Sequence, residues 1–213
     1  MEKTLLEQVK RHRIVVALRG VAPDEAVAVA RALADGGVRM LEITFDQSSP
    51  ARPADTARAI SAVKAALGER LLVGAGTVMS LEDLAAAYEA GAEYMLSPNL
   101  NLRVLERAKE LGLGAIPGAM TPSEVAAAHE AGADLVKLFP CDVLGLGYIK
   151  ALKAPVSQVP LLAMGGVNAG NLRDYLALVE GVGVGSAIVD RALVREGRLE
   201  ELTARARAFT GQL

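Results

Sequence analysis

The feature that most constrains the fold of this chain is a repeated order of elements, in which a helical segment ends at a glycine and a short apolar segment follows. This order recurs at Gly36, Gly91, Gly112, Gly132 and Gly181. Glycine ends helices because, lacking a Cβ, it adopts left-handed backbone angles at little steric cost. Strict alternation of helices with buried strands indicates a parallel sheet with right-handed crossovers.

Eight apolar segments have the length of a strand. They occupy residues 13–19, 38–45, 71–75, 93–97, 113–116, 134–140, 161–164 and 182–185. Eight strand–helix units in 213 residues predict an α/β fold, a single (β/α)8 TIM barrel that forms one domain over residues 1–213, with a lead-in helix at residues 3–12. An open doubly wound sheet is the alternative. A solenoid is disfavoured, because the units differ in length and share no side-chain signature.

The composition of the chain excludes several classes of protein. Hydrophobic residues make up 52% of the chain, aromatic residues only 3%, and tryptophan is absent, so the core must be aliphatic. A net charge of -2 argues against a nucleic-acid partner. The single cysteine, Cys141, rules out an internal disulfide and a cysteine zinc site. No signal-peptide core and no membrane-spanning apolar run of roughly 18 residues occur, so we expect a soluble cytoplasmic protein with no membrane partner.

A lysine in the middle of a predicted strand is the most unusual feature. Lys137 lies within the apolar segment at residues 134–140. Charged residues are rarely buried unless paired, and burial lowers the pKa of a lysine. A neutral amine in a closed pocket is a nucleophile that forms a Schiff base with a carbonyl substrate. The alternative is a structural ion pair, because such pairs also perturb pKa values.

A carboxylate on another strand supplies a partner for this amine. The period of two places Glu42 and Thr44 on one face of the segment at residues 38–45. In a barrel, Glu42 and Lys137 would both point inward, as a general acid/base beside a nucleophile. An ion pair buried for stability alone gains little, because desolvation offsets the attraction. We therefore favour catalysis over a structural pair.

Two glycine-containing turns predict a phosphate site. Gly165 and Gly166 follow the seventh predicted strand, and Gly185 and Ser186 follow the eighth. In TIM barrels phosphate commonly binds to backbone N–H groups at these two loops. A P-loop with its GK[ST] sequence is absent.

Other candidates are better explained as structure. His12 and His129 fall in predicted helices, and Cys141 has no histidine within sequence reach. Asp46 lies near Glu42 and leaves a divalent metal site as an alternative.

Seven short motifs along the chain resemble those of a known family. The motifs are LEIT at 41–44, GAGTV at 74–78, Ser97-Pro98, IPG at 116–118, KLFP at 137–140, GGV at 165–167 and Gly185-Ser186. They occur in the order seen in the class I 2-keto-3-deoxy-6-phosphogluconate (KDPG) and 4-hydroxy-2-oxoglutarate (KHG) aldolases. The resemblance spans essentially the whole chain. It implies a (β/α)8 barrel, usually a homotrimer, that needs no metal or other cofactor.

The resemblance also implies roles for individual residues. Lys137 is similar to the Schiff-base lysine and Glu42 to the acid/base of the family. The site residues that it implies for substrate binding are Arg19, Gly76, Thr77, Pro98, Phe139, Met164, Gly165, Gly166, Gly185 and Ser186. Thr77, with the backbone of residues 74–76, resembles the pyruvate-carboxylate site, and Phe139 resembles the apolar wall beside the lysine. The last four of the site residues resemble the phosphate cradle.

The implied reaction is cleavage of 2-dehydro-3-deoxy-6-phosphogluconate to pyruvate and glyceraldehyde 3-phosphate, and of 4-hydroxy-2-oxoglutarate to pyruvate and glyoxylate. In the glucose branch an arginine stands where this chain has Asp46, and Arg19, followed by Arg52, is the expected substitute. A threonine linked there to stereochemical preference is here Met164. Several motifs resemble the sister 2-dehydro-3-deoxy-6-phosphogalactonate aldolases more closely, so that substrate is the alternative. A metal-dependent lyase and a non-catalytic barrel that binds a phosphorylated metabolite are the remaining hypotheses.

Overall fold

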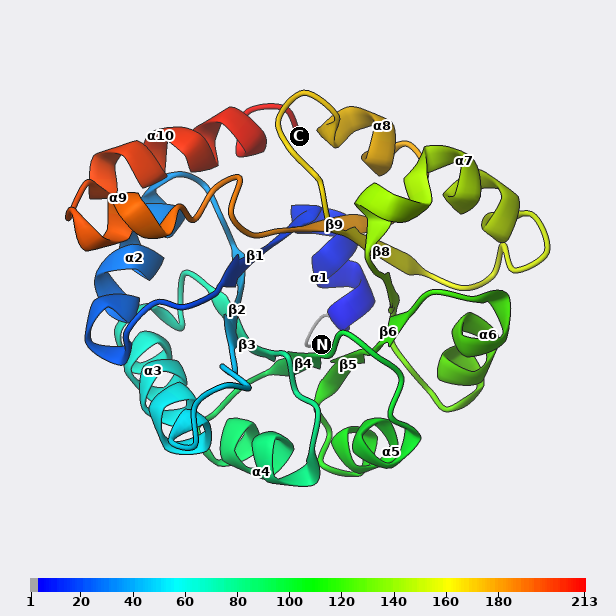
Figure 1. The fold of residues 1–213 in the computed structure, drawn as a ribbon, viewed down its shortest axis with the longest axis horizontal. Helices are drawn as coiled ribbons and strands as arrows, with labels where there is room; N and C mark the ends of the chain where they lie inside the picture. The colour runs from blue at the N-terminus through cyan, green and yellow to red at the C-terminus, as the bar shows by residue number, and fades with distance from the viewer. Residues whose placement is uncertain (1–3) are drawn as a thin grey trace.

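The structure is a computed structural model that describes residues 4–213. Its parallel strands form a nearly closed barrel with the helices around the outside (Figure 1), which confirms the predicted (β/α)8 fold. The strands are β1 Ile14–Leu18, β2 Met40–Thr44, β3 Leu72–Gly76, β4 Tyr94–Leu96, β5 Gly114–Ile116, β6 Gly118–Ala119, β7 Val136–Leu138, β8 Leu161–Met164 and β9 Gly181–Val184. Their order around the sheet is β5-β4-β3-β2-β1-β9-β8-β7-β6.

The helices complete the alternation. They are α1 Leu5–His12, α2 Pro23–Asp35, α3 Arg52–Leu67, α4 Leu81–Glu89, α5 Leu102–Glu110, α6 Pro122–Glu130, α7 Cys141–Lys153, α8 Leu172–Leu176, α9 Arg191–Arg195 and α10 Leu199–Thr210. Within the described residues no helix is long and apolar enough to cross a membrane.

The fifth predicted strand is divided in two at Pro117. Proline has no N–H to donate and interrupts a strand ladder, so β5 pairs with β4 while β6 pairs with β7. The backbone N–H of Lys137 donates to the Pro117 carbonyl at 2.8 Å. Because only Pro117 separates β5 from β6, the two halves continue one another along the chain, and the nine strands occupy the eight positions of the barrel.

Alternate residues on each strand face two different layers. Leu41 and Ile43 of β2 belong to the large aliphatic cluster that also contains the helix side chains. Met40 belongs to a smaller cluster inside the barrel, together with residues from β1, β4 and β8. This alternation confirms the period of two predicted for β2 and directs Glu42 inward.

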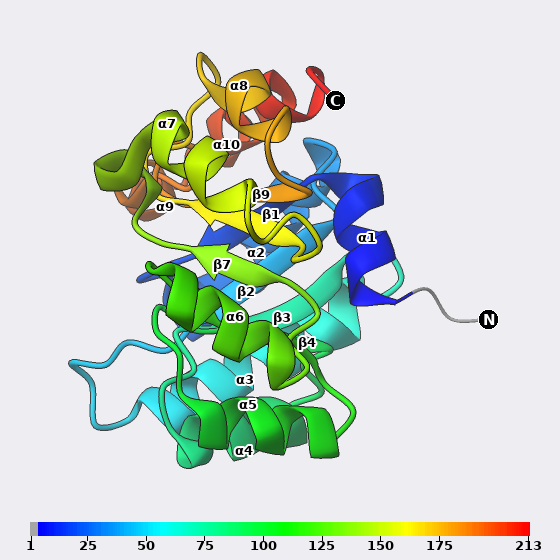
Figure 2. The ribbon, with the colours of Figure 1, turned by 90° about the vertical axis from the view of Figure 1, so that its right-hand side faces the viewer.

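Helix α1 covers the amino-terminal end of the barrel (Figure 2). Its first turn is fixed by a capping box between Thr4 and Glu7. Leu5, Leu6 and Val9 pack against the interior cluster. The opposite end, where the strands terminate, is therefore the one that is free to hold a site.

The sequence pattern predicts a short helix at residues 148–152 and a later helix capped by Asn168, and the structure differs from both and adds a third helix. Helix α7 begins at Cys141 rather than Tyr148, because it runs through a kink at Gly145 (φ 71°) that the sequence pattern reads as a helix boundary. Helix α8 is capped at Asn171, since Asn168 closes a turn instead by accepting from the Gly170 N–H at 2.9 Å. Helix α9 was not expected, because five residues give no periodic pattern.

Candidate active site

Lys137 occupies the middle of β7 and points into the barrel. Only 3% of the residue is exposed. Its Nζ lies 4.9 Å from the centre of the Phe139 ring, which stands two residues later on the same face. Burial lowers the pKa of the Lys137 amine, and the charge of Arg19 acts in the same direction while Glu42 opposes it. The environment therefore makes the neutral, nucleophilic form of the amine more accessible than it is in an exposed lysine.

Glu42 faces the same interior from β2. It is 1% exposed, and its Oε2 is buried without a hydrogen-bond partner among the described residues. Burial raises the pKa of the Glu42 carboxyl group, although the charges of Lys137 and Arg19 act against the shift. A carboxyl group with a raised pKa and an unused oxygen is suited to accept and return a proton.

The glycines of β3 create the space that Glu42 occupies. A Cβ on Gly76 would lie 2.2 Å from Oε2 of Glu42, and a Cβ on Gly74 would lie 2.5 Å from the Tyr94 ring. The ring is fully buried, and its hydroxyl donates to the Leu41 carbonyl at 2.8 Å. The two glycines of β3 thus leave room in the barrel interior for the Tyr94 ring beside Gly74 and for the Glu42 carboxyl group beside Gly76.

A pocket of about 710 Å³ opens at the carboxyl ends of β1, β8 and β9. Seven of the ten predicted substrate-binding residues line it together: Arg19, Phe139, Met164, Gly165, Gly166, Gly185 and Ser186. Phe139 also contacts Lys137, so the pocket borders the amine. The structure therefore brings the predicted phosphate turns and the predicted amine to one end of the barrel.

The other three predicted residues lie nearby without lining that pocket. Gly76 contacts Glu42, as described above. Thr77 follows β3 with a left-handed backbone (φ 60°), and Pro98 packs against Gly118 after β4. A non-glycine residue at positive φ is uncommon and must be held by its surroundings.

The Thr77 turn is held by a hydrogen-bonded network around the buried Asp83, which the sequence did not reveal. The Gln47 side-chain amide donates to the Thr77 carbonyl at 3.2 Å and to Asp83 at 3.5 Å. Asp83 is fully buried and pairs with Arg52 at 3.1 Å. These contacts connect the loop after β2, the start of α3 and the start of α4 beneath the turn.

This network also distinguishes Arg19 from Arg52, the two residues expected to replace the arginine that the glucose branch has at position 46. Arg52 is paired with Asp83, whereas Arg19 lines the pocket and influences the pKa values of both Lys137 and Glu42. Asp46 lies outside this pocket, in a smaller hollow of about 270 Å³, and hydrogen bonds from Ser48 lower its pKa. The geometry therefore favours Arg19 as the substitute.

Sequence reasoning missed three residues at this end of the molecule. Tyr94 fills the interior beside Glu42, while Asp190 and Arg191 line the pocket. Tyr94 could have been found from the alternation in β4. The other two belong to the unexpected helix α9 and its cap, so no pattern placed them at a strand end.

The residues set aside in the sequence remain outside the site. Burial raises the pKa of the Cys141 thiol to about 11, and its Sγ donates to the Leu138 carbonyl at 3.1 Å. His12 and His129 lie on α1 and α6 and do not line the pocket. In residues 4–213 no three His, Cys, Asp or Glu side chains are grouped so that they could hold a metal ion.

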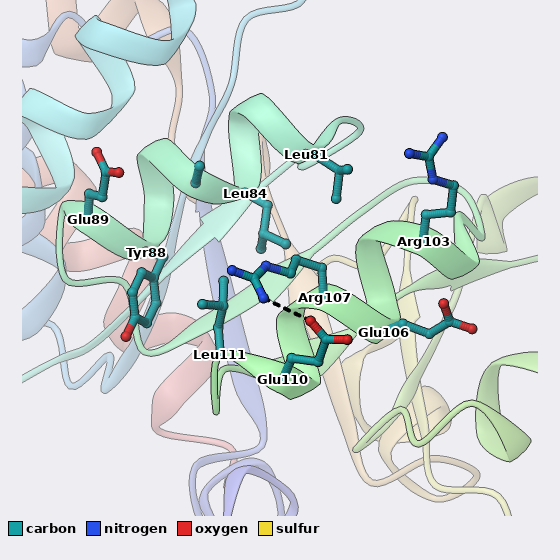
Figure 3. A pocket seen from close by; sticks show the side chains of 10 residues that line it. Leu81, Leu84, Tyr88, Glu89, Arg103, Glu106, Arg107, Glu110 and Leu111 are labelled. Carbon is teal, nitrogen blue, oxygen red and sulfur yellow. Dashed lines mark hydrogen bonds and ion pairs between the residues drawn. The ribbon is translucent and has the colours of Figure 1, made fainter.

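A second hollow of about 500 Å³ lies outside the barrel, between α4 and α5 (Figure 3). Leu81, Leu84 and Tyr88 line one side, and Arg107 pairs with Glu110 at 2.8 Å on the other. None of the predicted site residues lies there.

The family model described as KDPG and KHG aldolase matches residues 5–205. The chain is 36% identical to the 2-dehydro-3-deoxy-6-phosphogalactonate aldolase of Escherichia coli K12, over 92% of this chain and 91% of that one. It is 35% identical to the KHG/KDPG aldolase of the same organism, over 86% and 84%.

A solved structure shares the fold closely. The KDPG aldolase of Legionella pneumophila, with pyruvate captured as a covalent carbinolamine intermediate, is 26% identical with a TM-score of 0.87. The match covers 98% of this chain and 99% of that chain.

Proposed function

The chain belongs to the KDPG and KHG aldolase family, whose members are class I aldolases and therefore lyases, and from this premise we propose its substrate and the residues that act on it. The proposed reaction cleaves 2-dehydro-3-deoxy-6-phosphogluconate to pyruvate and glyceraldehyde 3-phosphate. A second, weaker substrate is 4-hydroxy-2-oxoglutarate, which would yield pyruvate and glyoxylate. One observation carries the assignment of roles: a buried lysine and a buried glutamate influence each other's pKa inside the barrel, and the lysine lies against Phe139, which lines the pocket.

In the proposed first step the neutral amine of Lys137 attacks the C2 carbonyl of the 2-oxo acid. Proton transfer and loss of water from the carbinolamine give a protonated imine, which is an electron sink. The lowered pKa of the amine supports this role, because only the unprotonated nitrogen carries the electron pair that forms the bond.

Glu42 is the proposed proton carrier in the steps that follow. It accepts the proton of the C4 hydroxyl as the C3–C4 bond breaks, and the bonding electrons move to C3 to form the enamine. The aldehyde leaves. Glu42 then returns a proton to C3, and water hydrolyses the imine to release pyruvate and the free lysine. A raised pKa suits a group that must be deprotonated in one step and protonated in the next.

The remaining predicted residues anchor the two ends of the substrate. The backbone at Gly76 and Thr77, together with Arg19, is the proposed binding site for the carboxylate. The turns at residues 165–166 and 185–186 are the proposed phosphate cradle, and they line the pocket. Phe139 and Met164 supply apolar walls there. Pro98, which packs against Gly118 after β4, is a further proposed substrate contact.

The 4-epimer, 2-dehydro-3-deoxy-6-phosphogalactonate, is the second candidate substrate. The 36% identity to an enzyme of that name favours it, as does Met164, which lines the pocket where the glucose branch has a threonine. Both epimers give the same two products, so steady-state cleavage of each epimer and of 4-hydroxy-2-oxoglutarate, followed by pyruvate release, separates the three substrates.

A covalent trap tests the chemistry independently of the substrate. Borohydride added with pyruvate should reduce the imine and leave a stable adduct on the peptide that contains Lys137. Lys153, which is held by the Leu178 carbonyl and Glu180, is the matched control and should stay unmodified. Absence of an adduct at Lys137, or chelator-sensitive cleavage without an adduct, would favour a metal-dependent lyase. Binding of substrate without turnover would favour the non-catalytic barrel.

We further propose that the protein is a homotrimer, as its family resemblance implies. Exposed apolar side chains at the ends of neighbouring units, Met79, Leu81, Leu102 and Met120, provide surface that self-association could cover. Light scattering on the eluted protein should give three times the mass of 22.2 kDa.

A further inference from the structure

The strongest unassigned feature is an arginine of α9 that reaches the pocket. Arg191 lines the pocket together with the turns at residues 165–166 and 185–186. It belongs to none of the motifs that identify the family, and no role follows for it from the chemistry proposed above.

The backbone at the end of β1 makes room for this side chain. Gly20 has a left-handed backbone (φ 66°), and a Cβ there would lie 2.9 Å from Cζ of Arg191. The guanidinium therefore rests directly against the Gly20 backbone, next to Arg19. Any larger residue at position 20 would push it away from the pocket.

Within the described residues Arg191 has no hydrogen bond and no ion pair, so its donors remain available. The adjacent Asp190 is already engaged: it accepts from the Ala192 N–H at 2.8 Å and pairs with Arg205 at 3.2 Å. The nearest acid to the glycine turn, Asp142, packs beside Gly165 and Gly166 and does not line the pocket. Arg191 also lines the smaller hollow that holds Asp46, and its charge contributes to the lowered pKa of that carboxyl group, but among the described residues its guanidinium donates no hydrogen bond to Asp46. Its donors therefore stay free at the pocket wall.

The two arginines of the pocket differ in what they can reach. Arg19 influences the pKa values of Lys137 and Glu42, so it lies near the proposed reaction centre. Arg191 has no such influence on either group, and its guanidinium lies against Gly20 instead. A guanidinium presents paired donors that match the oxygens of a phosphate.

We propose that Arg191 is a specificity-determining residue, which binds the phosphate of the substrate together with the glycine turns that line the same pocket and so favours phosphorylated over unphosphorylated 2-oxo acids. The inference rests on the proposed function. It explains how a cradle built mainly of neutral backbone N–H groups, with acidic residues on its flanks, could hold a dianion.

The test compares two substrates in Arg191→Gln. Cleavage of 2-dehydro-3-deoxy-6-phosphogluconate, or of its 4-epimer if that is the better substrate, should lose roughly 10- to 100-fold in kcat/KM, mainly through KM, as expected for a lost charge-assisted hydrogen bond. Cleavage of 4-hydroxy-2-oxoglutarate should change less than about twofold, because it carries no phosphate. Arg191→Lys should recover part of the loss, since it restores the charge without the paired donors.

Arg195→Gln is the matched control, because Arg195 lies on the same short helix, is exposed, and does not line the pocket. It removes the same charge and should leave both substrates unchanged. Competitive inhibition by inorganic phosphate should weaken in Arg191→Gln and not in Arg195→Gln.

An equal loss on both substrates, or no loss on the phosphorylated one, would overturn the role of Arg191 while leaving the aldolase chemistry intact. The proposed function fails in a different way: the unmodified protein would then cleave none of the substrates and form no adduct with pyruvate. Thermal melting of each variant shows whether any loss comes from unfolding.

Discussion

The interior of the barrel and the mouth of its pocket hold charged groups by opposite means. Inside, Lys137 and Glu42 are almost completely buried, and the space for the carboxylate exists only because Gly76 has no side chain. At the mouth, neutral glycine turns are combined with accessible arginines. The function of the interior therefore depends on close fit and desolvation, so a substitution there should cost much activity. The function of the mouth depends on charge and hydrogen bonding, so a substitution there should cost less.

Removing the interior amine should have the largest effect. Lys137→Met replaces it with an apolar chain of similar length, and we expect turnover to fall by roughly 10⁵-fold or more, as when other covalent nucleophiles are removed. Pyruvate release at saturating substrate measures this loss. The protein should remain folded, because methionine fills the same space and the Glu42 carboxyl group, whose pKa burial already raises, can become protonated when the amine is absent. A folded variant that retains substantial cleavage would contradict covalent catalysis at this residue.

Removing the interior carboxylate should have the next largest effect. Glu42→Gln keeps the shape of the side chain but cannot take or return a proton, so turnover should fall by about 10²- to 10⁴-fold. Reductive trapping of pyruvate on Lys137 should persist, because the amine is still present. Unchanged turnover would contradict the acid/base role.

Displacing the carboxylate without deleting it should cost less. In Gly76→Ala the new Cβ would meet Oε2 of Glu42 at 2.2 Å, so the carboxyl group must move, and we expect turnover to fall by roughly 10- to 100-fold. Gly147→Ala is the matched control, because a Cβ there meets nothing within 4 Å. Equal activity in the two variants would show that the position of Glu42 is not critical.

The mouth should respond more weakly. A Cβ on Gly185 meets nothing within 4 Å, so Gly185→Ala should fold normally while its methyl group enters the space proposed for the phosphate. We expect KM for the phosphorylated substrate to rise by about tenfold with a smaller change in kcat, a cost near 1.4 kcal/mol. An unchanged KM would show that the phosphate does not bind at this turn.

The pH dependence of the interior amine should be the most subtle test. Burial lowers the pKa of Lys137, so its neutral fraction should rise at a lower pH than that of an ordinary lysine. The Glu42 carboxylate favours the ammonium form, so Glu42→Gln should move the midpoint to still lower pH. Competitive acetylation of Lys137 across pH measures both midpoints, with the exposed Lys150 as internal reference. A midpoint that rises in Glu42→Gln would contradict this coupling.

Most of the fold, and the strand positions of the candidate site residues, followed from local patterns. The helix–glycine–strand order predicted the barrel, and the period of two on β2 correctly directed Glu42 inward. The division of the fifth strand at Pro117 was not anticipated, because the ladder bonds that define it come from β4 and β7, distant in sequence. Asn168 was assigned as a cap because its residue type suits one, yet the chain closes a turn there first.

By itself the sequence determined which side chains are chemically unusual: a lysine and a glutamate in apolar strands, and glycines after the seventh and eighth predicted strands. It could do so because burial periodicity and turn preferences are local properties of the chain. Only the tertiary structure decided which of these groups share a space. In the folded chain Arg52 pairs with Asp83, whereas Arg19 and Arg191 line the pocket. Glu42 packs against Gly76. Those outcomes depend on the closure of the barrel, which brings together residues that are far apart along the chain.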